Sequence, residues 1–406
     1  MDNHMVKRAF IALMLALPGG LHAQITLPPV GALVDPVISR VQTALAPADE
    51  VVRSIDVLAA ERLDRLTKFV AQHPDETEFD SAGQPARRGE LLVIDPRPDD
   101  LAAAQRGGFA LIEQQRIEGI NIGYARLAVP PRLPLAKAER ALRKLLPQAE
   151  VTADQLHFQS GSRAQSGSSQ PLLAGLPRGG TIGVIDGGVV GGGTVAAQVG
   201  FAAGAPHPNA HAQAIRSLLV AAGTAKLYVA DVYGTDLAGG NALSLARALG
   251  WMAQQRVPVV SISLIGPPNP LVARAVAAAQ AGGMVVVAAV GNDGAAAPPA
   301  YPASYPNVIA VTGVDGRGRV LLEAGKASHL DYAAPGADIT AIGLDGRRVS
   351  LRGTSFAAPL AAARIAAHRA ATAKPQQVLS LTDAEAVRAG RKTGRGILCG
   401  ACRSGS

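Results

Sequence analysis

Aromatic residues are scarce in this 406-residue chain, where phenylalanine, tryptophan and tyrosine together make up 3% of the sequence. A hydrophobic core must therefore be built mainly from alanine, valine, leucine and isoleucine. The scarcity also argues against the aromatic platforms on which single-stranded nucleic acids stack. Lysine and arginine give a formal net charge of +8, but they form no dense run. We therefore expect a solvated basic surface and no nucleic-acid partner.

The chain also lacks a cysteine framework and any apolar run long enough to cross a membrane. Its two cysteines, Cys399 and Cys402, lie in the C-terminal tail 399–406 and cannot cross-link the body of the protein. The apolar run at residues 9–17 is too short for a span of about 20 residues. Basic residues 7–8 precede it and small residues follow it, which is typical of a secretory signal peptide over 1–23. We therefore expect an exported protein, periplasmic or secreted, with no membrane span.

What remains is a mostly apolar chain with 17% charged residues, which excludes disorder and predicts two or three domains. Residues 24–87 are interpreted as an N-terminal helical segment and linker. The helix is predicted because apolar residues recur at spacings of three and four from Val52 to Val70. Its polar face mixes both charge signs, so we expect it to pack on a neighbouring domain and not on a membrane. The polar stretch 73–88 is predicted to be a linker.

Residues 88–158 have the order β-α-β-β-α-β, which is typical of a small α+β, ferredoxin-like domain. The predicted strands are 90–94, 109–116, 120–129 and 150–158, and the predicted helices are 98–105 and 135–146. Residues 159–177 are rich in serine and glycine and are predicted to be a flexible linker.

Residues 178–398 alternate apolar strands with helices, which predicts an α/β domain: a parallel sheet with helices on both faces. The predicted strands are 181–186, 225–232, 257–265, 284–291 and 307–314, and the predicted helices are 211–222, 243–255 and 271–281. In such sheets, sites form beyond the carboxyl ends of the strands.

Four residues at or near those ends can together perform acyl transfer. Asp186 ends the first strand, His211 begins a helix, Asn292 follows the strand 285–290, and Ser355 lies before an alanine-rich helix. Each alone is explained by a turn, a solvated helix start or a helix cap. Together they supply a serine nucleophile, a histidine base, a carboxylate that orients the base, and an amide donor for an oxyanion.

The residues around these four resemble the subtilisin-like serine peptidases, or subtilases, from about Thr181 to Ala370. The segments are GTSFAAP around Ser355, VVVAAVGNDG around Asn292, and the later YPASYPNVIAVTGVD and YAAPG. The resemblance implies a catalytic triad of Asp186, His211 and Ser355 and an oxyanion-hole role for Asn292. Two positions depart from the family pattern, because Gly187 follows Asp186 and Ala212-Gln213 follow His211. His207 is a rival for His211, but Pro208 follows it and it precedes the helical pattern. A zinc pair of His207 and His211 is disfavoured for the same proline.

The resemblance also implies how peptides bind. Residues 261–266 resemble the edge strand on which the family binds an extended peptide, so Ser263, Leu264 and Gly266 are candidate substrate-binding residues. Ile265 replaces a family glycine there, which predicts a pocket for small or slender side chains.

The 88–158 unit resembles subtilase propeptides, which predicts an intramolecular partner released by self-cleavage between about Phe158 and Leu176. A permanently attached accessory domain is the alternative. Calcium commonly supports the family's fold, but the sequence names no ligands, and no metal or other cofactor is predicted. The tail Cys-x-x-Cys is interpreted as a local disulfide, ahead of a redox or zinc site.

The sequence therefore predicts an exported serine endopeptidase made as a self-processed zymogen, acting on protein or peptide substrates. A catalytically silent subtilase-like binding or scaffolding protein is the first alternative, because of the altered residues after Asp186 and His211. A nucleotide-binding α/β protein is the second, from glycines 187–193, although their spacing does not match the dinucleotide fingerprint.

Overall fold

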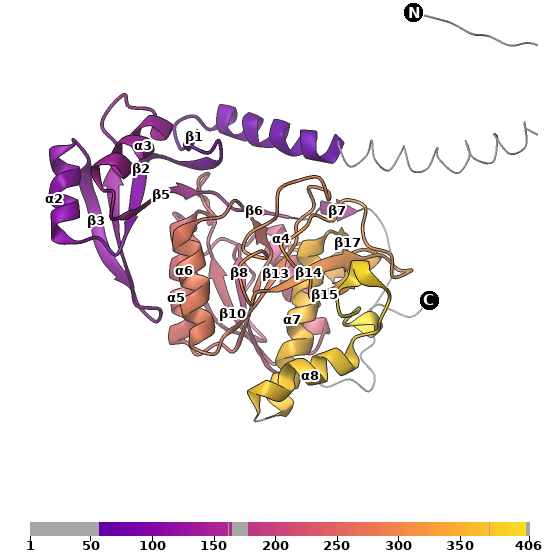
Figure 1. The fold of residues 1–406 in the computed structure, drawn as a ribbon. Coiled ribbons are helices and arrows are strands. Elements are labelled where there is room, and N and C mark those ends of the chain that lie inside the picture. Colours follow the sequence, from indigo (N-terminus) through magenta and orange to yellow (C-terminus); the bar gives the residue numbers. More distant parts are fainter. Residues whose placement is uncertain (1–56, 161, 165–177, 373, 403–406) are drawn as a thin grey trace, which may run out of the picture. The chain divides into compact units, whose positions relative to one another are not determined.

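The structure, a computed structural model, describes residues 57–160, 162–164, 178–372 and 374–402 (Figure 1). The predicted signal peptide and most of the predicted linker 159–177 lie outside these residues. None of the helices described is both long enough and apolar enough to span a membrane. The predicted N-terminal helix is present over residues 57–72.

Residues 77–155, here called the α+β domain, form one sheet and two helices, as predicted. The elements are β1 (Thr77–Phe79), β2 (Pro85–Ile94), α2 (Pro98–Arg106), β3 (Ala110–Ile117), β4 (Ile122–Ala128), α3 (Leu135–Leu145) and β5 (Glu150–Gln155). The sheet order is β1-β2-β4-β3, and β5 pairs with β2 on the side away from β4. The prediction of a linker over 73–88 was wrong in part, because β1 and the first half of β2 lie there.

The two faces of β2 belong to different cores, and for this reason its second half is buried without alternation. Leu91 and Val93 pack with the buried residues of α2 and α3. Leu92 and Ile94 join the cluster that contains the buried residues of α5 (Ala242–Gln254) and α6 (Pro270–Ala281). The helices of the α+β domain thus cover one face of its sheet, and the other face packs against two helices of the next domain.

Residues 178–402, here called the parallel-sheet domain, contain a seven-stranded sheet with the order β15-β14-β13-β11-β8-β10-β9. All its strand pairs are parallel. The strands are β8 (Thr181–Asp186), β9 (Val195–Gly200), β10 (Lys226–Asp231), β11 (Val259–Ile262), β13 (Val285–Ala289), β14 (Ile309–Val314) and β15 (Tyr332–Pro335).

Helices cover both faces of this sheet, as predicted, and alternate side chains of one strand face opposite layers. Ile182 and Val184 of β8 pack in the cluster that contains α4 (Ala210–Ala221) and α7 (Thr354–Ala371), whereas Ile185 joins the α5 and α6 cluster. Figure 1 shows α5 and α6 on one side of the strands and α7 on the other. This arrangement directs the carboxyl ends of β8, β11 and β13 toward one edge, where the candidate site lies.

Several departures from the prediction concern strands. β9, β15, β16 (Ile339–Ile342) and β17 (Arg348–Arg352) were not predicted, and the run 257–265 is divided into β11 and β12 (Leu264–Ile265). The predicted flexible linker begins with two short strands, β6 (Phe158–Gln159) and β7 (Ser162–Ala164). β6 pairs with β12, and β7 pairs with β17, which also pairs with β16.

The C-terminal part adds α8 (Pro375–Glu385) and the predicted local disulfide between Cys399 and Cys402. Both cysteines are buried in the α4 and α7 cluster.

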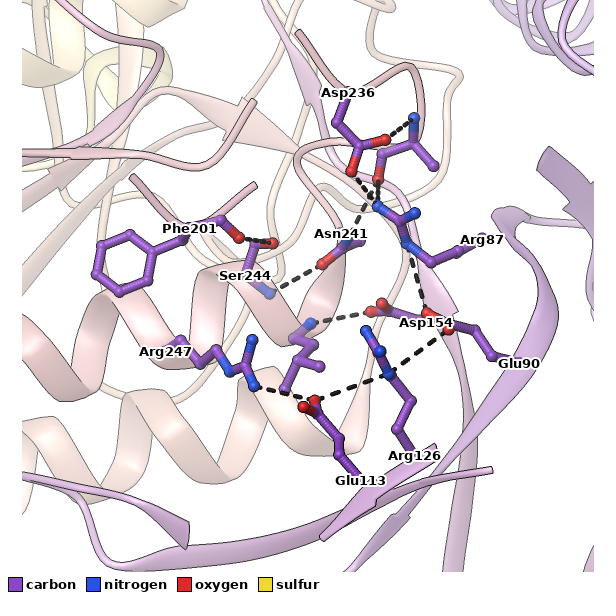
Figure 2. Close-up of polar contacts among 12 residues, drawn as sticks. Arg87, Glu90, Glu113, Arg126, Asp154, Phe201, Asp236, Asn241, Ser244 and Arg247 are labelled. Atoms are coloured by element: carbon purple, nitrogen blue, oxygen red, sulfur yellow. Dashed lines mark hydrogen bonds and ion pairs between the residues drawn. The ribbon is translucent and has the colours of Figure 1, made fainter. Parts of the chain in front are cut away.

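The two domains also meet through a polar network, which Figure 2 shows. Asp154 accepts a hydrogen bond from the backbone N–H of Leu243 in the first turn of α5, at 2.9 Å. Around it, Arg87 pairs with Asp236, and Arg247 pairs with Glu113 at 2.9 Å. Since the free N–H groups at a helix start need acceptors, Asp154 completes the capping of α5 from the other domain.

Candidate active site

Asp186 is held at the carboxyl end of β8 and is completely buried. Its carboxylate accepts the backbone N–H of Gly187 at 2.8 Å and contacts the His211 imidazole, with Nδ1 3.0 Å from Oδ2. A buried carboxylate needs such partners, because an unpaired charge in the interior is costly. The geometry fixes the ring of His211 with Nδ1–H toward the carboxylate and leaves Nε2 free to accept a proton.

His211 is the second residue of α4, which Asn209 caps by accepting the N–H of Ala212 at 2.9 Å. The His211 side chain is 10% exposed, and its Nε2 lies 3.0 Å from Oγ of Ser355. The rival His207 is exposed, and its backbone N–H donates to Asp231. The structure thus brings His211, and not His207, to Asp186 and Ser355.

The two departures from the family pattern have local explanations. A side chain at residue 187 would overlap the amide of Asn209, the residue that caps α4, so only glycine fits there. Ala212 is fully buried in a small cluster with Val189 and Val229. Neither change moves His211 out of reach of its two partners.

Ser355 is the second residue of α7, and this helix begins directly after Gly353, whose φ of 137° other residues rarely adopt. Ser263 anchors this turn, because its hydroxyl donates to the carbonyl oxygen of Ser355 at 2.8 Å. At this position in the first turn, the backbone N–H of Ser355 has no partner within its own helix. The serine hydroxyl therefore faces a base while the adjacent N–H is available to an oxyanion.

Asn292 lies just beyond β13, and its side chain is oriented by a hydrogen bond. Its Oδ1 accepts the backbone N–H of Thr354 at 2.9 Å. Its Nδ2 is buried and has no hydrogen-bond partner among the described residues. Buried polar groups without a partner are rare and call for an explanation. A donor fixed in this way, beside the nucleophile, is suited to a negative charge that develops on a substrate oxygen.

The structure divides the predicted substrate strand between two elements. Residues 261–262 belong to β11, which lies inside the sheet between β8 and β13, so they form no free edge. Leu264 and Ile265 form β12, which pairs with β6 of the same chain. Leu264 is fully buried in the core, and Gly266 leaves no room for a side chain because the His157 ring lies against it.

The chain's own residues 158–160 lie on this strand as an extended segment. Phe158 is opposite Ile265 and Gln159 is opposite Leu264. The backbone N–H of Ser160 donates to the carbonyl of Ser263 at 3.4 Å, and the Gln159 amide donates to Asp186 at 2.6 Å. Sequence analysis missed Gln159 and Ser160, because their composition is that of a linker.

A cleft of about 630 Å³ adjoins Ser160 and the oxyanion donor Asn292. Ile265 lines it and packs against Gly291, on which a Cβ would lie 3.0 Å from Ile265 Cδ1. Ile265 thus places a branched side chain in the cleft at the position where the family has glycine.

In the described part of the chain, no group of three or more histidine, cysteine, aspartate or glutamate side chains is placed to hold a metal ion. The structure therefore names no carboxylate cluster for the calcium that the family's fold commonly binds.

Comparison with known proteins identifies the family. The model of the subtilase family matches residues 182–391, just over half of the chain. The chain belongs to the subtilase family. The match includes Asp186, His211, Asn292 and Ser355.

Curated relatives of this subtilase include Subtilisin BL of Lederbergia lenta, which is 35% identical over 143 residues, or 35% of the chain and 52% of the relative. An alkaline protease of Shouchella clausii is 34% identical over 143 residues, or 35% of the chain and 37% of the relative. The matched part of the chain thus spans about half, or less, of the length of these relatives.

Solved structures share the fold at low sequence identity. Fervidolysin of Fervidobacterium pennivorans, a keratinolytic enzyme related to subtilisin, aligns over 78% of this chain and 61% of its own, with a TM-score of 0.63 and 17% identity. The epidermin leader peptide processing serine protease of Staphylococcus aureus aligns over 77% of this chain and 98% of its own, with a TM-score of 0.60 and 15% identity.

Proposed function

We propose that this subtilase is an exported serine endopeptidase that hydrolyses peptide bonds through an acyl-enzyme. The observation that carries the proposal is the chain of contacts from Asp186 through His211 to Ser355, with 3.0 Å at each step. A serine hydroxyl is a weak nucleophile unless a base takes its proton, and Nε2 of His211 is within reach to do so.

The chemistry follows from these positions. Oγ of Ser355 attacks the peptide carbonyl while His211 takes the hydroxyl proton, and Asp186 stabilises the imidazolium. The oxyanion of the tetrahedral intermediate accepts hydrogen bonds from Nδ2 of Asn292 and the N–H of Ser355. His211 then protonates the leaving amine. A water molecule, deprotonated by His211, hydrolyses the acyl-enzyme and regenerates the Ser355 hydroxyl.

We further propose that the α+β domain is the enzyme's own propeptide. Residues 158–160 lie along β12, where an extended substrate would pair. They also lead from the α+β domain toward the parallel-sheet domain. The many non-local contacts of a parallel sheet make folding slow, so a domain that packs on α5 and α6 can act as a template. Export is proposed from the predicted signal peptide.

The test is hydrolysis of unfolded casein by the purified, self-processed protein. Replacing Ser355 by alanine is expected to abolish hydrolysis, because loss of the nucleophile alone lowers kcat by about 10⁶-fold in a subtilisin and because the variant also keeps its propeptide. Ser380→Ala, at an exposed position of α8, is the matched control and keeps full activity. A wild-type protein that folds, stays uncut and hydrolyses no peptide supports the silent binding protein instead.

A further inference from the structure

One carboxylate in the cleft belongs to neither the triad nor the oxyanion hole. Asp293 follows the oxyanion donor Asn292 in sequence, and its side chain is only 11% exposed. It lines the same 630 Å³ cleft as Ser160, whose N–H binds the Ser263 carbonyl. Asp293 therefore lies where the side chain on the acyl side of a scissile bond would enter.

Two arginines from a distant part of the chain bind this carboxylate. In the helix 57–72, Arg62 places Nε 3.1 Å from one oxygen of Asp293, and Arg65 places a guanidinium nitrogen 2.5 Å from the other. Leu66 of the same helix also lines the cleft. Phe69, one turn further along, packs edge-on against Phe158 with ring centroids 5.2 Å apart. The helix thus forms one wall of the cleft, next to residues 158–160.

These arginines lie before the α+β domain, so they leave with it when the propeptide is released. Within the described residues, no other cation pairs with Asp293. The other carboxylate that the parallel-sheet domain contributes to the cleft is Glu323, which keeps its partner Arg352 at 2.7 Å in that same domain. Processing therefore leaves Asp293 without a counter-charge. A substrate side chain that covers this carboxylate again is favoured if it carries a cation, because a buried charge without a partner is costly.

We propose that Asp293 makes the processed enzyme prefer lysine or arginine on the acyl side of the scissile bond. This inference rests on the proposed function. The apolar walls that Ile265 and Gly291 provide suit the slender aliphatic stem of these residues, whose charged end reaches the carboxylate. In the uncut chain Arg62 and Arg65 pair with Asp293, and in the processed enzyme a lysine or arginine of the substrate takes their place.

The chain's own residue at this position, Ser160, carries no charge for the same reason. Arg62 and Arg65 already pair with Asp293 in the uncut chain, so the residue before the cut needs no cation of its own. An intramolecular cut also needs little binding energy from that side chain, because the effective concentration of a tethered segment is high.

The test uses the full-length protein after it has processed itself. Fluorogenic peptides that differ only at the residue before the cut (lysine, arginine, glutamine or leucine) give a set of kcat/KM values. We expect lysine and arginine to exceed glutamine by about ten-fold or more, since hydrogen bonds to charged groups are worth about 1.5–3 kcal/mol. Asp293→Asn brings the ratio of lysine to glutamine close to one. Asp345→Asn, which makes the same charge change at an exposed turn outside the cleft, keeps the wild-type ratio.

Inhibition of the wild type gives a second measurement in case the Asp293 variant does not fold. Benzylamine, a cation, is expected to compete with substrate at least ten-fold better than neutral benzyl alcohol. Equal kcat/KM values for lysine and glutamine, or a lysine preference that survives Asp293→Asn, overturn the inference and leave the peptidase intact. A protein that folds, does not process itself and cleaves none of the peptides overturns the proposed function itself.

Discussion

One histidine, at the contact between the two domains, has a side chain that its surroundings hold in the neutral form. His157 is fully buried, its ring lies against Gly266, and neither ring nitrogen has a hydrogen-bond partner in the described part of the chain. Burial lowers the pKa of His157 to about 4, because a charged imidazole loses its hydration there. The ring is therefore held neutral by its surroundings.

This depressed pKa predicts how stability depends on acid. The contribution of neutral His157 is complete above the ordinary pKa of about 6.5 and is lost as the pH falls toward 4. In a Ser355→Ala background, which keeps the chain uncut, we expect the unfolding free energy to fall by on the order of 3 kcal/mol over that range. His157→Leu removes this loss.

The measurement is a series of denaturant-unfolding curves from pH 7 to pH 4. His207→Gln, a change at an exposed histidine, is the control and keeps the wild-type loss. If His157→Leu loses as much stability in acid as its parent, the account of His157 is wrong.

The placement of Asp186, His211, Asn292 and Ser355 at one site could be predicted from the sequence, and the contacts of the linker could not. Asp186, Asn292 and Ser355 stand at strand and helix ends, where sequence patterns are informative, and they carry family motifs. Gln159 and Ser160 carry no such signal, because only their pairing with β12 makes them extended. The contact of Arg65 with Asp293 joins residues 228 apart in the chain, which no local pattern encodes.

Among the secondary-structure elements, α5 depends most clearly on its neighbours. Its first turn is capped by its own Asn241, which accepts the N–H of Ser244 at 2.9 Å, and by Asp154 of the α+β domain. Burial is the largest cause and repulsion from Glu90 the next, and together they raise the pKa of Asp154 to about 7. The fold therefore favours the protonated carboxyl, the opposite direction to His157.

This raised pKa predicts that the free energy of unfolding decreases as the pH rises from about 4 through 7. The stabilising protonated form is complete below the ordinary pKa of about 3.8 and is lost as the pH rises through 7. In the uncut Ser355→Ala chain, Asp154→Asn is expected to flatten this slope, because an amide still accepts the N–H of Leu243 and does not ionise. The gain at pH 8 is on the order of a few kcal/mol.

Denaturant-unfolding curves at pH 4 and pH 8 measure the unfolding free energy of Asp154→Asn and of its uncut Ser355→Ala parent. Asp99→Asn, at an exposed position of α2, is the matched control and changes neither value by more than about 0.5 kcal/mol. An Asp154→Asn chain that is less stable than its parent at pH 8 contradicts the prediction.

Strands were harder to predict than helices at this scale. The helices α4, α5 and α6 begin within one residue of their predicted starts, since capping residues and apolar periodicity are local signals. β6 and β7 form in a serine-rich and glycine-rich segment that has little strand propensity of its own. Their partners β12 and β17 lie more than 100 residues away in the sequence, so tertiary pairing decides them.

For the molecule as a whole, the register of β6 on β12 predicts where the chain is cut. Ser160 is the residue whose N–H reaches Ser263, next to the nucleophile. We therefore expect the released propeptide to end at Ser160 and the mature protein to begin at residue 161. Mass spectrometry of both fragments measures this, with Ser355→Ala as the uncut control. A cut within residues 165–177, on the far side of β7, contradicts this register.

The central claim is that His211, held by Asp186, activates the hydroxyl of Ser355. The most direct test is the rate at which a fluorophosphonate probe labels the processed protein, with the modified residue mapped by mass spectrometry. The account predicts rapid modification of Ser355 alone, and a fall of at least about 10³-fold in the rate after His211→Gln. A Ser355 that stays unlabelled, or one that reacts equally fast without the imidazole, contradicts it.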